Sequence, residues 1–274
     1  MAISAPDFDF IRKLIHERSA IVIEPGKEYL VEARLQPLAQ REGFPSIQEL
    51  VAKLRSDRFN CLHQKVVDAM TTNETSFFRD VHPFETMRKI IVPEIMAKRA
   101  GLRELNVWCG ASSSGQEPYT IAMLLRENFP ELAKWKVVFM ASDISQEMLT
   151  RSRNGMYSQL EINRGLPAAY LVKYFQRVGM EWQIKEDLRK TIDFREINLC
   201  GAWPHIPKLD IIFMRNVLIY FDVNTKKTIL GKIRQLLKPD GYLFLGAAET
   251  TLNLDDNFTR MNFPQSGCYR LKDN

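Results

Sequence analysis

A loop of small residues near the middle of the chain has the composition of a ligand site. It reads Gly-Ala-Ser-Ser-Ser-Gly over residues 110–115 and follows an apolar run at residues 105–109. Pro118 stands where the first turn of a helix is expected, so the segment predicts a strand, a tight loop and a helix in that order. In open α/β sheets this arrangement forms the crevice where nucleotides and related ligands bind, because small residues let a ligand approach the backbone.

The residues around this loop narrow the class of ligand. Gly110 and Gly115 have the spacing of a Walker A loop, but Gln116 and Glu117 follow them in place of Lys and Ser or Thr, which disfavours ATP and GTP. The three-glycine dinucleotide fingerprint is absent. Glu117 would repel a pyrophosphate and attract a cation such as the sulfonium or α-ammonium of S-adenosylmethionine. A plain strand-to-helix turn with a surface glutamate remains the alternative on these residues alone.

A second apolar run, residues 136–143, ends in Asp143. An acid at the end of the second strand is where a ribose binds through its hydroxyls, and two charge-assisted hydrogen bonds there would contribute about 1.5–3 kcal/mol each. We therefore predict that Asp143 binds the ribose. The alternative is a helix N-cap, since a helix is expected to start near Ser145.

Two later segments extend the same pattern. Residues 209–216 read as a buried strand, and residues 236–246 read as a helix end, a Lys-Pro-Asp-Gly turn and a strand. Strands that alternate with helices predict a parallel sheet covered on both faces. The helix, Lys-Pro-Asp-Gly turn and strand also resemble a segment common in S-adenosylmethionine-dependent methyltransferases.

Composition sets limits on partners and location. The 274 residues carry 38 basic and 33 acidic side chains, a net charge of +5 that is too small to require nucleic acid. We expect a soluble cytoplasmic protein without membrane insertion, because no signal peptide and no apolar run of about 18 residues is present. Four scattered cysteines predict buried free thiols, and four histidines without ligand spacing predict no metal site. These are Cys61, Cys109, Cys200 and Cys268, with His16, His63, His82 and His205.

The first 70 residues predict a separate helical domain. Apolar side chains recur there at helical spacing in four segments, divided by Pro25-Gly26, Gly43 to Pro45 and Ser56-Asp57. Lys27, Arg34 and Arg41 are seven residues apart, which places three cations along one stripe of a helix. The stripe is either a solvated face or a docking site for an acidic partner.

Four segments resemble the CheR family of chemotaxis receptor methyltransferases: TTNETSFFRD at 71–80, GQEPY at 115–119, ASDI at 141–144 and RNVLIYFD at 215–222. They occur in matching order between about residues 10 and 270. The resemblance implies methyl transfer from S-adenosylmethionine to glutamate side chains of methyl-accepting chemotaxis proteins, with S-adenosylhomocysteine as product. It also implies cofactor contacts by Asn73, Thr75, Arg79, Glu117, Asp143, Asn198, Leu199, Arg215 and Asn216.

The resemblance further implies the domain plan. An N-terminal all-helical domain would span residues 1–70, and a linker lining the active site would span residues 71–80. A Rossmann-like class I methyltransferase domain would fill residues 81–274, with an antiparallel β-subdomain inserted at about 163–195. Gln116 departs from the second glutamate of many members, and Ala247-Ala248 depart from a common His-Ser.

Glutamate esterification suits these residues. The side chain of glutamate has a pKa near 4.3, so it is ionised at neutral pH and needs no general base. What remains is alignment of the carboxylate with the methyl carbon at about 3–3.5 Å, which contributes roughly 7–11 kcal/mol. We assign this positioning to Arg79 and Tyr220. Without the resemblance they would be equally well read as a surface cation and a core tyrosine.

Two other functions are compatible with parts of this pattern. A nucleic-acid methyltransferase that acts on amino groups typically carries Asp/Asn-Pro-Pro-aromatic after the fourth strand, but residues 215–218 read Arg-Asn-Val-Leu. A non-catalytic cofactor-binding adaptor stays open.

The inserted segment bears on receptor recruitment. Members that bind a C-terminal receptor pentapeptide carry a longer, glycine-rich hairpin loop, whereas Gly179 is the one glycine between residues 176 and 192. We therefore expect no pentapeptide binding, and direct docking on the receptor helices partly through Lys27, Arg34 and Arg41.

Overall fold

The computed structural model describes residues 3–272, and their contacts divide into two compact units. One unit holds the described residues up to Thr72 together with Tyr220–Thr225. The other holds Asn73–Ile219 and the chain from Lys226 onward. The domain plan predicted a helical domain of residues 1–70 but did not include residues 220–225 in it.

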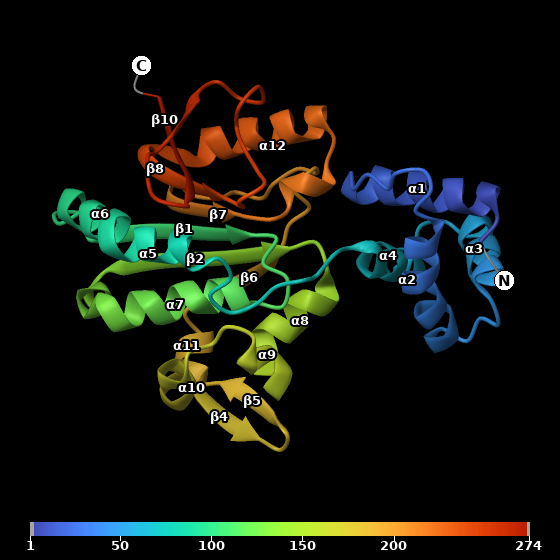
Figure 1. The fold of residues 1–274 in the computed structure, drawn as a ribbon, viewed down its shortest axis with the longest axis horizontal. Coiled ribbons are helices and arrows are strands. Elements are labelled where there is room, and N and C mark those ends of the chain that lie inside the picture. Colours follow the sequence, from blue (N-terminus) through green and yellow to red (C-terminus); the bar gives the residue numbers. More distant parts are fainter. Residues whose placement is uncertain (1–2, 273–274) are drawn as a thin grey trace. The chain divides into compact units, whose positions relative to one another are not determined.

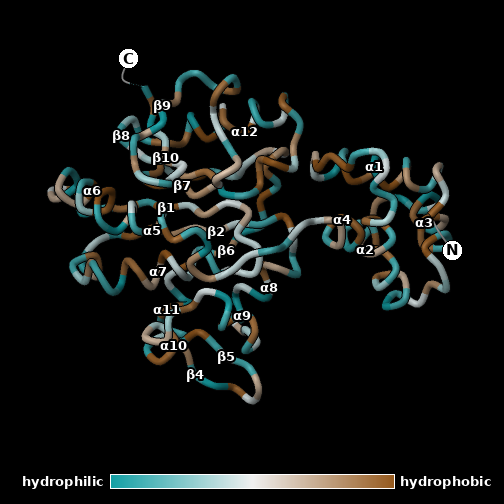
Figure 2. The backbone as a smooth tube through the Cα atoms, viewed as in Figure 1, coloured by the Kyte–Doolittle hydropathy of each residue, from teal (hydrophilic) through white to brown (hydrophobic). Residues whose placement is uncertain are grey.

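Four amphipathic helices build the first unit: α1 (Ala5–Ser19), α2 (Glu28–Arg41), α3 (Ile47–Ser56) and α4 (Cys61–Met70). Three of them begin at side-chain caps, because Ser4, Ser46 and Asn60 each accept a backbone N–H of the first turn. Hydrophobic and hydrophilic residues are interspersed along these helices (Figure 2), and hydrophobic side chains of all four, such as Ile11, Val31, Leu50 and Val66, are buried.

A seven-stranded sheet forms the centre of the second unit, in the order β6-β2-β1-β7-β8-β10-β9 (Figure 1). Strands β6, β2, β1, β7 and β8 run parallel, whereas β10 runs antiparallel to β8 and β9. The strands are β1 (Glu104–Gly110), β2 (Lys136–Asp143), β6 (Asp193–Glu196), β7 (Leu209–Met214), β8 (Leu237–Leu245), β9 (Phe258–Arg260) and β10 (Gly267–Leu271).

The predicted turn before the last long strand is part of β8 itself. Leu209 pairs with Leu237 and Ile211 with Tyr242, so the register shifts and residues 238–241 form an irregularity within the strand. Residues 238–241 have no pairing partner on β7 in this register, so the predicted Lys-Pro-Asp-Gly turn corresponds to an unpaired stretch, and β8 begins before it at Leu237.

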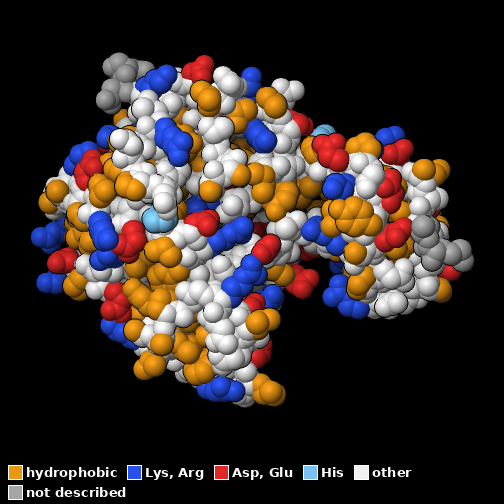
Figure 3. All heavy atoms as spheres, viewed as in Figure 1, with side chains coloured by type: hydrophobic (Ala, Val, Ile, Leu, Met, Phe, Trp, Pro, Cys, Tyr) orange, Lys and Arg blue, Asp and Glu red, His pale blue; other side chains and the backbone are white. Residues whose placement is uncertain are grey.

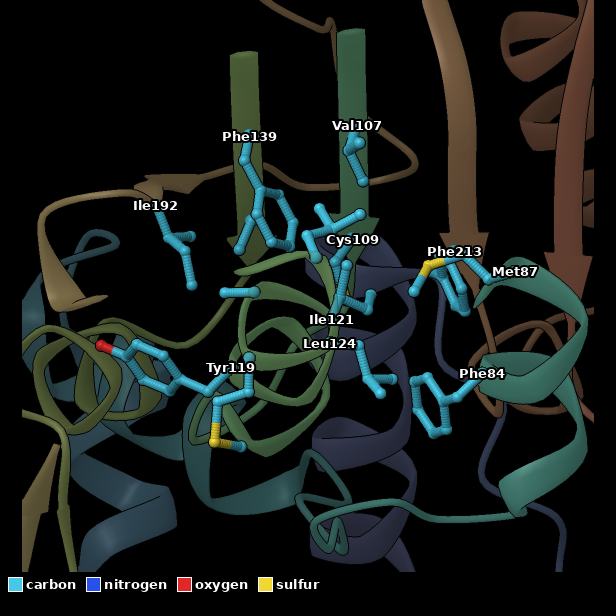
Figure 4. Close-up of a cluster of buried hydrophobic side chains, with 14 of the residues drawn as sticks. Phe84, Met87, Val107, Cys109, Tyr119, Ile121, Leu124, Phe139, Ile192 and Phe213 are labelled. Atoms are coloured by element: carbon cyan, nitrogen blue, oxygen red, sulfur yellow. The ribbon is translucent and has the colours of Figure 1, made fainter. Parts of the chain in front are cut away.

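Helices cover this sheet. A continuous helical stretch comprises α5 (Val81–Thr86), the π-helical η1 (Met87–Ile91) and α6 (Val92–Lys98). Then follow α7 (Gln116–Asn128), η2 (Pro130–Lys134), α8 (Gln146–Asn154), η3 (Leu218–Tyr220) and α12 (Val223–Leu236). Figure 4 shows side chains of β1, β2 and β7 meeting those of α5, η1 and α7, among them Val107, Phe139, Phe213, Phe84, Met87 and Ile121.

A second, three-stranded antiparallel sheet is inserted between α8 and β6, in the order β3-β5-β4. It consists of β3 (Met156–Tyr157), β4 (Phe175–Val178) and β5 (Glu181–Ile184), with α9 (Gln159–Asn163), α10 (Ala168–Tyr174) and α11 (Glu186–Arg189) around it. Its first strand lies upstream of the predicted limit near residue 163. The structure contains the helical domain, the α/β domain with a largely parallel sheet and the small inserted sheet. The predicted fold class is therefore confirmed.

A buried ionic cluster fixes the amino ends of β1 and β7. The Asp210 side chain is 1% exposed and accepts from the backbone N of Asn106 at 2.8 Å. It also accepts from Lys238 Nζ at 2.9 Å and Arg99 Nε at 3.2 Å. Removing one member of such a cluster leaves the others with uncompensated charge in a poorly solvated place.

We therefore predict that Asp210→Ala lowers the free energy of unfolding by about 3–5 kcal/mol. The matched control is Asp193→Ala, which removes an exposed partner of Arg195 and should cost under about 1 kcal/mol. Chemical denaturation of both variants checks the difference, and equal losses would contradict the role given to the buried cluster.

Candidate active site

The loop between β1 and α7 has an unusual backbone. Ala111, Ser113 and Gly115 have φ values of 52°, 49° and 95°, in the left-handed region. For residues other than glycine this conformation costs on the order of 1–3 kcal/mol, and it persists only where surrounding groups fix it. The residue types at Ala111 and Ser113 do not predict this strain.

Strand β2 supplies two of the groups that fix the loop. The backbone N of Ser112 donates to the carbonyl of Ser142 at 2.8 Å, and the backbone N of Ser113 donates to Asp143 Oδ2 at 2.8 Å. The predicted loop and the predicted acid therefore lie together. Ser112 Oγ is buried and has no hydrogen-bond partner within residues 3–272, as expected of a loop that completes its contacts with a ligand.

Asp143 is buried at the carboxyl end of β2. Its second oxygen, Oδ1, accepts from the backbone N of Ser145 at 2.9 Å. Burial raises the pKa of Asp143 above its usual value, and the backbone amides oppose this rise. The N-cap of α8 is Ser145, whose side chain accepts from Met148, so the capping alternative does not account for Asp143. A carboxylate has about four acceptor positions, which leaves capacity for a ligand hydroxyl.

Arg215 lies between two acids. Its side chain is 1% exposed, and its Nη1 donates to Glu117 Oε1. Its Nη2 donates to Asp80 Oδ2 at 2.9 Å and to the carbonyl of Arg79 at 3.0 Å. The other oxygen of Glu117 accepts from the thiol of Cys109 at 3.2 Å. The predicted cofactor residues Glu117 and Arg215 are thus direct partners, and the three side chains of Arg215, Glu117 and Asp80 carry a net negative charge.

The predicted linker packs against the same loop and helix. The carbonyl of Asn73 accepts from Ser113 Oγ at 2.9 Å, and the backbone N of Phe78 donates to Thr120 Oγ1 at 3.1 Å. Thr75 lies between these two anchors and is half-buried. Three predicted cofactor residues, Asn73, Thr75 and Arg79, therefore belong to a segment fixed at both ends.

Glu249 organises the turn after β7, a role that no pattern in the sequence predicted. Its Oε1 accepts from the backbone N of Val217 and Leu218 at 2.8 and 2.7 Å. Its Oε2 accepts from Asn216 and Gly246 at 2.8 and 2.6 Å. Asn216 has a φ of 58°, so the carboxylate fixes a left-handed residue at a predicted cofactor position. The one feature of the sequence that could have indicated this role is an acidic residue soon after a predicted buried strand.

The two catalytic candidates lie in different units. Arg79 is half-buried in the second unit, and its Nη1 donates to the carbonyl of Glu74 at 2.8 Å. Tyr220 ends η3 in a segment that clusters with the first unit, where its carbonyl accepts from the backbone N of Val22 at 3.0 Å. Their catalytic roles stay predictions.

Asn198 and Leu199 follow β6. Asn198 is half-buried, and its side-chain oxygen accepts from the backbone N of Cys200 at 3.0 Å. Leu199 is buried. Their contact with a cofactor likewise stays a prediction.

The three cations of the proposed docking stripe are not equivalent. Arg34 is half-buried, and its guanidinium donates to the carbonyls of Met70 and Thr71 and to the hydroxyl of Thr72. Lys27 and Arg41 are exposed at the two ends of α2. The docking hypothesis therefore depends on Lys27 and Arg41. On the face shown in Figure 3, basic and acidic side chains are mixed over each unit.

The four cysteines, which were predicted to be buried free thiols, differ in burial. All four are free, but Cys61 is exposed and Cys200 is only half-buried, so the prediction of burial is confirmed for Cys109 and Cys268 alone. Within residues 3–272 His, Cys, Asp and Glu side chains nowhere gather in a group of three that could hold a metal ion. No helix in the described part of the chain is long and apolar enough to cross a membrane.

Two family models match the chain. The CheR methyltransferase all-alpha domain matches residues 6–71, and the CheR methyltransferase SAM binding domain matches residues 73–266. Chemotaxis protein methyltransferase 1 of Pseudomonas aeruginosa is 40% identical over 277 residues, with 99% of this chain and 100% of that protein covered. A chemotaxis protein methyltransferase of Pseudomonas putida is 40% identical over 271 residues, covering 97% and 98%. One of Vibrio parahaemolyticus is 36% identical over 276 residues, covering 99% of both chains.

Ribose binding by Asp143 can be separated from its contacts to the loop and to α8. Asp143→Ala should weaken binding of S-adenosylmethionine by about 1.5–3 kcal/mol, or roughly ten- to a hundredfold, because charge-assisted hydrogen bonds are lost. Ser145→Ala removes the cap of α8 but keeps the carboxylate, so its affinity should stay close to that of the unaltered protein. Calorimetry measures both, and unchanged affinity in Asp143→Ala would remove the ribose assignment.

Proposed function

Because the chain belongs to the CheR family of S-adenosylmethionine-dependent methyltransferases, we propose that it esterifies glutamate side chains of methyl-accepting chemotaxis proteins. The products would be glutamate methyl esters and S-adenosylhomocysteine, and the reaction would serve chemotaxis adaptation. The substrate would be the helical cytoplasmic domain of the receptor, so the enzyme would act in the cytoplasm.

The observation that carries this proposal is the placement of two carboxylates around one strained loop. Glu117 lies in the first turn of α7, and Asp143 binds the loop backbone from the end of β2. We assign Asp143 to the ribose and Glu117 to the cationic end of the cofactor, because a carboxylate stabilises each. Ser112 Oγ is buried without a hydrogen-bond partner among residues 3–272, and the loop carries only small side chains, a composition that lets a ligand approach a backbone closely.

S-adenosylmethionine supplies an activated methyl group on a sulfonium, and the acceptor carboxylate is already ionised at neutral pH. The contribution of the protein is therefore positioning. We assign Arg79 to steering the acceptor carboxylate and Tyr220 to orienting it. A tight bidentate pair with Arg79 would stabilise the reactant charge and weaken the nucleophile, so positioning without full neutralisation fits the reaction better.

The chemistry of the product tests the proposal. The purified protein, labelled S-adenosylmethionine and cytoplasmic receptor fragments should give label that mild alkali releases as methanol, because esters hydrolyse under conditions that methylated amines and nucleobases survive. Alkali-stable label would refute glutamate esterification. Cofactor binding without transfer to any receptor fragment would favour the adaptor alternative.

Arg79→Ala and Tyr220→Phe should each lower turnover about ten- to a hundredfold while the melting temperature changes little, since each loses one positioning contact. Arg195→Ala and Tyr29→Phe are the matched controls. Arg195 is an exposed partner of Asp193, and Tyr29 is an exposed residue of α2. Both controls should keep normal turnover. A normal rate in either test variant would remove that residue from the mechanism.

Receptor recruitment gives a further prediction. Strands β4 and β5 are joined by two residues, Gly179 and Met180, a connection that supports our expectation that no receptor pentapeptide binds. Titration with such a peptide should show no binding at micromolar concentrations, and micromolar affinity would contradict this.

Direct docking should instead depend on the exposed cations of α2. The double variant Lys27→Ala/Arg41→Ala should raise the KM for receptor several-fold at low salt and less at high salt, because surface charges are screened. Lys13→Ala/Arg58→Ala makes the same charge change at exposed positions outside α2 and should leave KM unaltered. Equal KM values for the two double variants would exclude the docking role.

A further inference from the structure

The strained loop of residues 110–115 accepts a hydrogen bond from a side chain that lies outside the parallel sheet. The carbonyl of Ser114 accepts from the hydroxyl of Tyr157 at 2.7 Å. Tyr157 is the second residue of β3, where it pairs with Trp182 of β5. The small inserted sheet therefore reaches the loop through one side chain.

The environment of Tyr157 makes this contact a fixed one. The residue is fully buried, and burial raises the pKa of its phenol well above the ordinary value, so the hydroxyl keeps its proton and donates. A Cβ on Gly115 would lie 3.1 Å from the same hydroxyl oxygen, so the loop also approaches the tyrosine closely at its left-handed glycine. The carbonyl it holds lies between Ser113 and Gly115, the two left-handed positions at this end of the loop.

The same ring also contacts the linker. Tyr157 and Phe77 meet edge to face with ring centroids 5.0 Å apart, and Phe175 of β4 lies 5.7 Å from Phe77. Phe77 is 1% exposed, so its ring is enclosed by aromatic side chains of the small sheet. Such pairs contribute beyond their buried area and fix the orientation of the rings.

A glycine of the inserted segment makes a second contact with the linker. Gly165 has a φ of 100°, and a Cβ there would lie 2.2 Å from the carbonyl oxygen of Phe77. The backbone of the inserted segment therefore touches the backbone of the linker at a place where no side chain fits. The linker carries three of the proposed cofactor residues and the loop contacts a fourth, Asp143, so the small subdomain holds two segments of the proposed cofactor site.

We propose that Tyr157 is a positioning residue of the methyltransferase, through which the inserted β-subdomain sets the affinity for S-adenosylmethionine. The inference rests on the proposed cofactor site at the loop of residues 110–115. It gives the subdomain a role in the cofactor half of the reaction, independent of how the receptor is recruited. Tyr157 contacts neither the cofactor nor the acceptor in this role, since it acts through Ser114 and Phe77.

The test compares two tyrosines of one subdomain. Tyr157→Phe keeps the ring contacts and removes the hydrogen bond to Ser114, so the affinity for S-adenosylhomocysteine should fall about 2- to 13-fold. The KM for S-adenosylmethionine should rise by a similar factor, while kcat at saturation and the KM for receptor stay within twofold. Tyr174→Phe is the control, because its buried hydroxyl donates to Glu127, away from the loop. Its cofactor affinity should not change.

A second pair of variants keeps the proposal testable if Tyr157→Phe folds poorly. Gly165→Ala would place a methyl group against the carbonyl of Phe77 and displace the linker, so it should also weaken cofactor binding. Gly179→Ala also places a side chain at a positive φ, of 60°, but its Cβ would meet nothing within 4 Å, so its affinity should stay normal. Calorimetry and thermal melting are run on all four variants.

Unchanged cofactor affinity in Tyr157→Phe, or equal losses in Tyr157→Phe and Tyr174→Phe, would overturn the inference while leaving the proposed function intact. Failure of the unaltered protein to bind S-adenosylhomocysteine would instead overturn the proposed cofactor site, and the inference with it.

Discussion

The buried guanidinium of Arg215 is the group on which the arrangement of the active site depends. Moving a cation out of water costs several kcal/mol, and the cost is offset only when its partners are well placed. Arg215 comes from the end of β7, Glu117 from the first turn of α7, and Asp80 from the residue before α5. One charge therefore requires that the end of a strand, the start of a helix and the end of the linker occupy fixed places. The aromatic ring of Phe84 lies 5.5 Å from the same guanidinium carbon and limits its access to water.

Residues with a left-handed backbone conformation are concentrated in the segments around Arg215. Nine residues other than glycine have positive φ within residues 3–272, and five of them belong to the linker, the loop after β1 or the turn after β7. These five are Phe78, Asp80, Ala111, Ser113 and Asn216. Left-handed conformations at such residues survive where hydrogen bonds over-determine the backbone, as the carboxylates of Asp143 and Glu249 do here. The site is thus held in shape before any ligand arrives.

Much of this site follows from local patterns in the sequence. The apolar run before Gly110 and the run ending in Asp143 predict two adjacent parallel strands, and their carboxyl ends must lie at one edge of a sheet. Pairings over long separations do not appear in such patterns. Arg215 and Glu117 are 98 residues apart, and Glu249 reaches amides 31 to 33 residues before it. The short strand β3 was missed for a related reason, because two residues carry no readable period and Tyr157 is fixed by tertiary contacts.

The grouping of Tyr220–Thr225 with the N-terminal helices has a consequence for synthesis on the ribosome. The backbone N of Val22 finds its partner in the carbonyl of Tyr220, nearly two hundred residues later in the chain. At roughly 5–20 residues per second, the stretch from Thr72 to Tyr220 takes about 7–30 seconds to emerge. During that interval the first helices can pack among themselves, but their last contacts must wait for a segment encoded far downstream. The N-terminal unit is therefore the first to begin folding and among the last to finish.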